Sequence, residues 1–297
     1  MLVFSQRAAR RRARAAAVAE ALGLLHDLEP SAPAGGPLSE RGGVFWVELP
    51  ERHLAAAVTR LPHLGYSTAV DLLVGAGPAG GPAAVRWRGH RWRLERLHTE
   101  DPAGHRERAP DRRGFLVEAG DGRVREVRGY RGDGAPLGRR GLPVCDARLL
   151  VNLVAVAGPG RLLDPFAGVG GVALEARAAG WAVVTADLDP ALRHGLGRLG
   201  GAHLVADAGR LPLRGGSVDA VATEPPYDRQ VGPLAGRALA EAHRLLRPGG
   251  ATAWLCAAWQ APGLRATAAG LGLRAALDTP VDRKGLPVVA LAWRKPF

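Results

Sequence analysis

The sequence has few cysteines and no long apolar runs. Cys145 and Cys256 are the only cysteines among 297 residues, and their spacing fits no metal motif, so we expect reduced thiols and no bound metal. No apolar run approaches the roughly 20 residues that cross a bilayer, which argues against a membrane protein. The basic N-terminal stretch has no clean small-residue cleavage site, so we expect a cytoplasmic protein.

Lysine is also scarce, although the chain is strongly basic. Lys284 and Lys295 are the only lysines, so arginine carries nearly all of the positive charge behind a formal net charge of +12. A basic balance favours nucleic-acid partners, because cationic side chains release counterions from phosphates. Ala, Gly and Pro are abundant alongside Arg, and a GC-rich genome produces this same composition. Charge alone therefore leaves the partner open.

The first 140 residues have the pattern of a small α+β unit. Helix-forming composition predicts a helix over residues 4–25. Residues 85–97 alternate apolar side chains with arginines, which predicts a hairpin that turns at Gly89 and His90. The arginines of this hairpin suit either contact with phosphates or a solvated outer face. Two more short strands are expected at 115–118 and 124–127.

The second half is organised around Leu162 to Gly171, which reads LLDPFAGVGG. Two leucines lead into Asp164, and three glycines then allow a sharp turn and close approach of a ligand to the main chain. The stretch is not the GxGxxG fingerprint and lacks the Lys-Ser/Thr of a phosphate loop, which argues against a nucleoside triphosphate. An acid at the end of a buried strand is costly unless it is bonded, so Asp164 is a candidate functional residue.

A second acid follows the next predicted strand. Asp187 comes about twenty residues after Asp164, which is the interval of one strand–helix–strand unit. Its two oxygens suit the two hydroxyls of a ribose. Asp189 is the alternative for this role, although Pro190 directly after it favours a helix N-cap.

Two further predicted strands lead into acids, Asp207 and Glu224. Ligands of open α/β sheets bind at the carboxyl ends of strands, so these acids and those of the two preceding strands predict one site. Glu224 is the first residue of the motif Glu-Pro-Pro-Tyr. The prolines fix the backbone so that a carbonyl points outward, and an oxygen of residue 224 and the carbonyl of Pro225 then accept N–H bonds from an amine. Tyr227 offers an aromatic face to an unstacked base. This chemistry depends on positioning and electrostatics.

In this order the two motifs resemble the S-adenosylmethionine-dependent amino-methyltransferases, and within them the THUMP-associated tRNA guanine-N2 type of the RNA methylase family. The resemblance covers residues 145–297, about half of the chain, and includes LLRPGG before a strand. It implies an α/β fold, with a Rossmann-like class I methyltransferase domain over 141–297 whose seven-stranded sheet is mostly parallel. A smaller α+β accessory domain over 1–140 precedes it.

The resemblance also implies S-adenosylmethionine as the cofactor, with its methionine portion near the glycine-rich turn and its adenine near Asp207. The family usually has Asp, Asn or Ser at the first position of the catalytic motif, and the extra methylene of Glu224 moves the carboxylate by about an ångström in a site where that counts. The expected cofactor-binding residues are Asp164, Phe166, Gly168, Gly170, Asp187, Asp207 and Ala208, and the expected catalytic residues are Glu224, Pro225, Pro226 and Tyr227.

The favoured reaction is methylation of guanine N2 in structured RNA, above all tRNA. An RNA-binding role for residues 1–140 rests on charge and on analogy. One alternative is a DNA adenine-N6 or cytosine-N4 methyltransferase, because the Pro-Pro-aromatic motif is shared. Another is a non-catalytic RNA-binding protein with a degraded site. The sequence leaves the target nucleotide and the oligomeric partner open.

Overall fold

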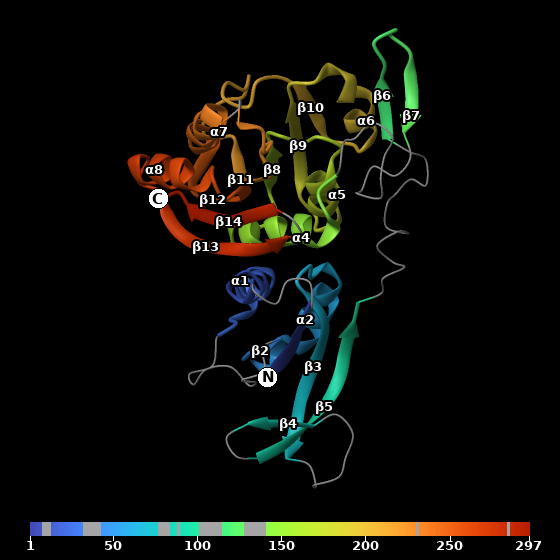
Figure 1. Cartoon of the computed structure of the whole chain (residues 1–297). Coiled ribbons are helices and arrows are strands. Elements are labelled where there is room, and N and C mark those ends of the chain that lie inside the picture. Colours follow the sequence, from blue (N-terminus) through green and yellow to red (C-terminus); the bar gives the residue numbers. More distant parts are fainter. Residues whose placement is uncertain are drawn as a thin grey trace.

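The computed structural model describes residues 1–7, 13–31, 43–76, 84–87, 90–100, 115–127, 141–229, 232–283 and 286–297. These ranges contain a five-stranded sheet, a seven-stranded sheet and a two-stranded hairpin (Figure 1). Within them, no helix is both long enough and apolar enough to cross a membrane.

The N-terminal sheet is antiparallel, with the strand order β2-β1-β3-β5-β4. Its apolar residues pack together with those of α1 in one hydrophobic cluster. The elements are β1 (Leu2–Gln6), α1 (Arg14–Leu24), η2 (His26–Leu28), β2 (Val44–Val47), η3 (Glu51–His53), α2 (Leu54–Arg60), η4 (Leu61–His63), β3 (Ser67–Ala76), β4 (Ala84–Trp87) and β5 (His90–Thr99).

The expected helix over residues 4–25 is wrong at its start. Residues Leu2–Gln6 form a strand between β2 and β3, with Phe4 opposite Phe45 on one side and Val70 on the other. Phe4 is fully buried and stacks on Phe45. This packing in the sheet makes residues 2–6 a strand, although they adjoin a segment of helix-forming composition. The predicted hairpin forms, but Trp87 pairs with His90, so His90 belongs to the strand. The side chains of residues 84–91, which include most of the arginines of this hairpin, lie outside the described residues.

The seven-stranded sheet has the order β10-β9-β8-β11-β12-β14-β13, in which β14 runs antiparallel to the other six strands. This confirms the predicted mostly parallel sheet. The elements are α4 (Val144–Val154), η5 (Ala155–Ala157), β8 (Arg161–Asp164), α5 (Gly171–Ala178), β9 (Ala182–Asp187), η6 (Pro190–Leu192), α6 (Arg193–Arg198), β10 (Ala202–Val205), β11 (Val218–Thr223), α7 (Gly232–Leu245), β12 (Leu246–Ala257), α8 (Ala261–Gly270), β13 (Arg274–Arg283) and β14 (Leu286–Arg294).

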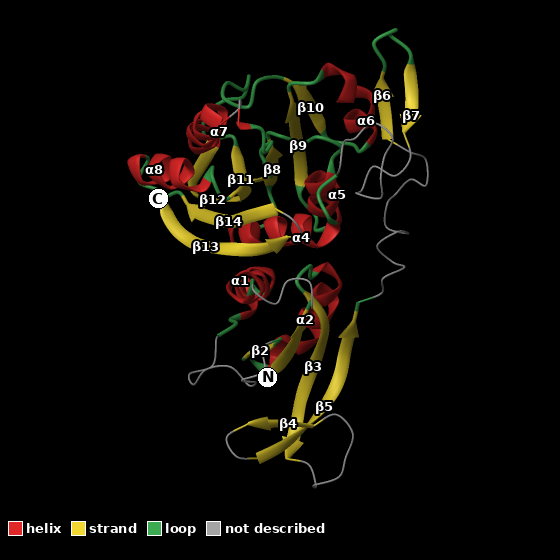
Figure 2. Cartoon of the chain, in the orientation of Figure 1, coloured by secondary structure: helices red, strands yellow, loops and turns green. Residues whose placement is uncertain are grey.

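Helices cover both faces of this sheet (Figure 2). Side chains alternate along β11: Ala220 and Ala222 pack in the cluster that contains α4 and α5, whereas Val221 packs in the cluster that contains α7 and α8. A strand buried on both faces explains the nearly continuous apolar run of β11.

The two halves share a single hydrophobic cluster. It runs from the strands of the N-terminal sheet through α1 to α4 and the alanines of β11 and β12. α1 packs against α4 and also reaches β13. The contact between the halves is therefore a continuous hydrophobic core, formed by buried apolar side chains from both of them.

The hairpin of β6 (Phe115–Glu118) and β7 (Val124–Val127) forms where the sequence predicts it. It lies against α6 of the second half, where Glu118 accepts from Arg193 Nη2 at 2.6 Å and contacts His194 Nε2 at 3.1 Å. The sequence pattern grouped this hairpin with the first 140 residues. The division into 1–140 and 141–297 stays a proposal.

Candidate active site

The acids that the sequence singled out lie at neighbouring strand ends. β9, β8 and β11 are adjacent and parallel, so Asp164, Asp187 and Glu224 follow one another along the same edge of the sheet. The chain order of the strands reverses between β8 and β11. Open α/β sheets bind ligands at such a reversal, because the loops there diverge to opposite faces.

The glycine-rich turn after β8 adopts backbone angles that favour glycine. Gly168 has φ of +52° and Gly170 has φ of +80°. A Cβ on Gly170 would lie 2.1 Å from Leu199 Cδ1, at the end of a side chain that would have to move, so the positive φ is the stronger reason for glycine here. A Cβ on Gly168 would meet no described atom within 4 Å, which leaves open space beside the main chain of the turn.

Asp187 ties the turn to β9. Its Oδ2 accepts from Gly168 N at 2.8 Å, and its Oδ1 accepts from Asp189 N at 3.0 Å. Each carboxylate oxygen has two lone pairs, so this carboxylate keeps capacity for two further donors. Asp189 accepts from Ala191 N at 2.9 Å and caps η6, as its position before a proline predicted.

Asp164 is almost completely buried, with 2% of its surface exposed. Its Oδ1 accepts from the Thr223 hydroxyl at 2.6 Å and from Phe166 N at 3.3 Å. Burial raises the pKa of this carboxyl to about 7. In the described part of the chain no donor reaches Oδ2, so both hydrogen bonds of this carboxylate are on one oxygen. The ring of Phe166 packs edge-on against Trp254, with the centroids 6.3 Å apart.

Asp207 and Ala208 differ in exposure. Asp207 follows β10, accepts from Gly209 N at 2.8 Å and keeps 44% of its side chain exposed. Ala208 is buried in the cluster that contains α7, so its side chain belongs to the core. Only the main chain at residue 208 can therefore reach a ligand at this edge.

The Glu-Pro-Pro-Tyr motif begins directly after β11 and is held by a residue far away in the sequence. Oε1 of Glu224 accepts from the Tyr227 hydroxyl and from Nη1 of Arg283, the last residue of β13. Nη1 also donates to the Tyr227 oxygen at 3.0 Å. Burial raises the pKa of Glu224, and the Arg283 charge opposes this shift without cancelling it.

The second proline is also anchored. Gln260 Nε2 donates to the carbonyl of Pro226 at 2.9 Å, and Gln260 Oε1 accepts from Ala257 N at 2.9 Å. The side chain of Gln260 thus connects the motif to the end of β12. Pro225 is buried and Pro226 is exposed.

Sequence reasoning missed Thr223, Gln260 and Arg283. Thr223 had a signal, because it directly precedes the motif. The other two had none, because Arg283 is 59 residues from Glu224 and Gln260 is 34 residues from Pro226. Only the pairing of the strands brings them to the motif.

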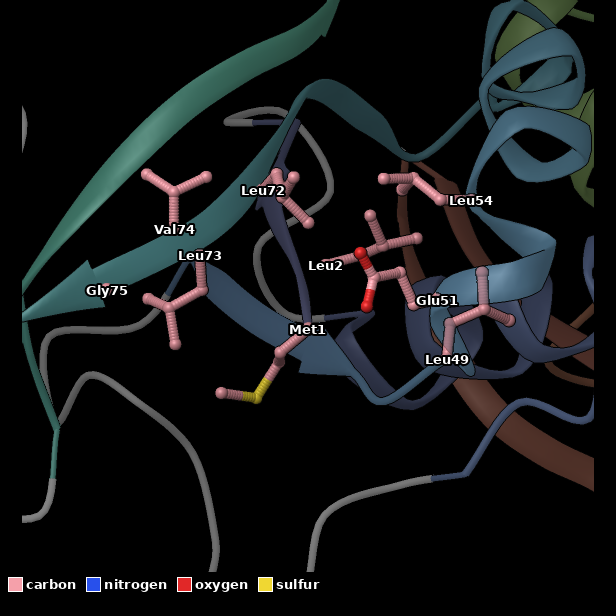
Figure 3. Close-up of a pocket in the computed structure, with 9 residues that line it drawn as sticks. All are labelled: Met1, Leu2, Leu49, Glu51, Leu54, Leu72, Leu73, Val74 and Gly75. Carbon is pink, nitrogen blue, oxygen red and sulfur yellow. The ribbon is translucent and has the colours of Figure 1, made fainter.

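A separate pocket of about 400 Å³ lies in the N-terminal half (Figure 3). Its walls are mostly apolar, with Leu49, Leu54 and Leu72 among them and Glu51 as the one carboxylate. It contains none of the residues that the sequence predicts for the site.

The strand order is that of the class I methyltransferase fold. Residues 163–254 match the family described as a methyltransferase domain. Residues 163–254 are therefore similar to a methyltransferase domain, and the second half has the class I methyltransferase fold, which confirms the predicted fold class.

More particular similarities are to a tRNA-modifying enzyme and to a solved structure. The tRNA (guanine(10)-N2)-dimethyltransferase of Methanothermobacter thermautotrophicus is 41% identical over 88 residues, 27% of this chain and 26% of that protein. The chain thus matches about a quarter of that relative's length. TrmN from Thermus thermophilus aligns with 99% of both chains at 18% identity and a TM-score of 0.53. That likeness extends the shared fold to the N-terminal half.

Proposed function

We propose that this protein transfers a methyl group from S-adenosylmethionine to an exocyclic nucleobase amine in RNA, with guanine N2 of tRNA as the preferred acceptor. The observation that carries the proposal is the position of Glu224-Pro225-Pro226-Tyr227 at the end of β11, beside the glycine-rich turn that follows β8. The segment shared with a tRNA guanine-N2 methyltransferase supports this acceptor.

The residues at the strand ends fit the cofactor. When bound, S-adenosylmethionine supplies an electrophilic methyl group on a sulfonium centre. Oδ2 of Asp164, which no donor of the described residues reaches, suits an ammonium group. The remaining lone pairs of Asp187 suit ribose hydroxyls, and the exposed Asp207 suits an adenine amine. The open space at Gly168 leaves room for a ligand against the main chain.

The motif after β11 suits the acceptor base. A nucleobase amine has a poorly available lone pair, so catalysis requires acceptors that orient its N–H bonds. Glu224 and the carbonyl of Pro225 take this role, which is positioning and electrostatic stabilisation. The Arg283 guanidinium carbon lies over the Tyr227 ring, 5.9 Å from its centre, so a base that stacks on this ring would need its opposite face.

The test is methyl transfer from labelled S-adenosylmethionine to unmodified total tRNA and to genomic DNA, followed by nucleoside analysis. We expect label in N2-methylguanosine and a loss of at least about 100-fold in Glu224→Ala. Asp278→Ala is the matched control, because this carboxylate is also ion-paired with an arginine, Arg265, but lies on the surface of the same domain. The control should keep the wild-type rate.

Two outcomes contradict the proposal. Label in DNA alone identifies a DNA amino-methyltransferase. Cofactor binding without transfer to either nucleic acid identifies a non-catalytic protein with a methyltransferase fold.

A further inference from the structure

A buried chain of polar groups joins the proposed catalytic motif to the N-terminal half. Arg283 pairs with Glu224 through Nη1, and its Nε lies 3.7 Å from Oδ2 of Asp146 in α4. The other oxygen of Asp146 accepts from the hydroxyl of Tyr66 at 2.8 Å. Tyr66 directly precedes β3 of the N-terminal sheet. Side chains from the segment after β11, from β13, from α4 and from the N-terminal half therefore contact one another in turn.

These groups are withdrawn from water. Tyr66 and Asp146 have no exposed surface, and the side chains of Arg283 and Glu224 are each 20% exposed. Burying charged groups costs more than burying apolar groups of the same size, and paired charges recover only part of that cost. Packing alone gives no reason to retain three charges at this place.

The bonds to Glu224 are one-sided. Tyr227 and Arg283 both donate to Oε1, and within the described ranges no donor reaches Oε2. A carboxylate held by one oxygen presents the other in a defined direction, which is what an amine acceptor requires.

We propose that Arg283 is a positioning residue: it holds Glu224 through Oε1 so that Oε2 receives the acceptor amine, and Asp146 and Tyr66 hold Arg283 in turn from α4 and the N-terminal half. This inference rests on the proposed function. It makes the N-terminal half part of the support of the active site, in addition to any contact with RNA.

The charges around Glu224 make the inference measurable. Arg283 from β13, Tyr227, Asp146 from α4 and Asp164 from β8 face this carboxylate. Among these described groups Arg283 is the one cation. Its removal leaves only neutral and anionic neighbours, which disfavour the ionised form of Glu224.

The experiment compares Arg283→Gln, Arg283→Lys and Tyr66→Phe with Arg274→Gln, an exposed arginine at the start of β13. In Arg283→Gln we expect kcat to fall about 10- to 100-fold, and the dissociation constant of S-adenosylmethionine to stay within about twofold. The acid limb of its kcat–pH profile should move to higher pH. Arg283→Lys should restore the position of that limb, Tyr66→Phe should lower kcat about threefold, and the control should match the wild type.

A second readout does not require activity. Carboxyl 13C NMR of glutamate-labelled protein, assigned with Glu224→Gln, reports the titration of Glu224 directly. A higher pKa in Arg283→Gln than in the wild type supports the inference. An unchanged titration, or a kcat of Arg283→Gln equal to that of the control, overturns it while the proposed function stands. Failure of the wild type to methylate any RNA overturns the proposed function itself, and the titration still tests the ion pair.

Discussion

Two buried carboxylates of this protein share an elevated pKa but differ in how they are bonded. Burial raises the pKa of both Glu20 and Asp164 to about 7. Glu20 receives donors on both oxygens: Gly65 N at 2.7 Å and Asn152 Nδ2 at 3.1 Å on Oε1, and Tyr66 N at 2.8 Å on Oε2. Asp164 receives both of its donors on Oδ1.

The difference separates a structural acid, Glu20, from the acid that we propose to bind the cofactor, Asp164. Glu20 lies on α1, and its donors come from the loop before β3 and from α4, so it fastens the two halves together. Asp164 lies at the carboxyl edge of the parallel sheet and keeps one oxygen for a ligand. An elevated pKa alone therefore does not distinguish the two acids, and the proposal for Asp164 rests on its oxygen without a donor at a strand end.

Loss of the Glu20 carboxylate should have the largest effect. Glu20→Ala leaves three buried donors without an acceptor, so we expect the free energy of unfolding to fall by about 4 kcal/mol. Urea denaturation at constant pH measures this change. A loss below about 1 kcal/mol would show that water replaces the carboxylate and that the halves are not fastened there.

Asp164→Ala should act on the cofactor more than on the fold. We expect the affinity for S-adenosylmethionine to fall about 30-fold, because the ammonium group loses its acceptor. Isothermal titration calorimetry gives the dissociation constant, with Asp278→Ala as the control carboxylate. Equal affinity in Asp164→Ala and in the wild type would assign Asp164 to the structure alone.

Cofactor binding should depend on pH near neutrality. The carboxyl of Asp164 is partly protonated at pH 7 in the free protein, and a cationic ligand requires its ionised form. The affinity for S-adenosylmethionine should therefore rise by up to about tenfold from pH 6 to pH 8, with release of a proton. Titrations in buffers of different ionisation enthalpy detect that proton, which Asp164→Asn should not release. A pH-independent affinity would refute the linkage.

Asp164 should also affect stability, and the sign of this effect is opposite to that of Glu20→Ala. The pKa of Asp164 is higher in the folded than in the unfolded protein, so its contribution is present below about pH 4 and is lost as pH rises through about 7. Asp164→Asn removes this dependence, so its unfolding free energy should exceed that of the wild type at pH 8 but not at pH 4, by at most about 4 kcal/mol. Parallel urea titrations of both proteins at the two pH values test it.

Much of the parallel sheet could be predicted from local patterns. LLDP and VDAVATEPPY have the apolar runs of strands that are buried on both faces, and an acid after each run places the site at the carboxyl edge. The first strand could not be predicted in this way. Residues 2–6 precede a segment of helical composition, and only their pairing between β2 and β3 makes them a strand.

The candidate site also has features that local sequence predicts and features that only tertiary contacts create. Sequence alone determined the glycine-rich motif, the tetrapeptide that we propose to be catalytic and the order of the acids, because each depends on a few consecutive residues. Tertiary structure alone decided that Arg283 holds Glu224 and that Gln260 anchors Pro226. It also decided that Glu20 receives hydrogen bonds on both oxygens and Asp164 on one. These pairings join residues that no local pattern connects, and hydrogen bonds and burial arise only once the strands and helices have packed.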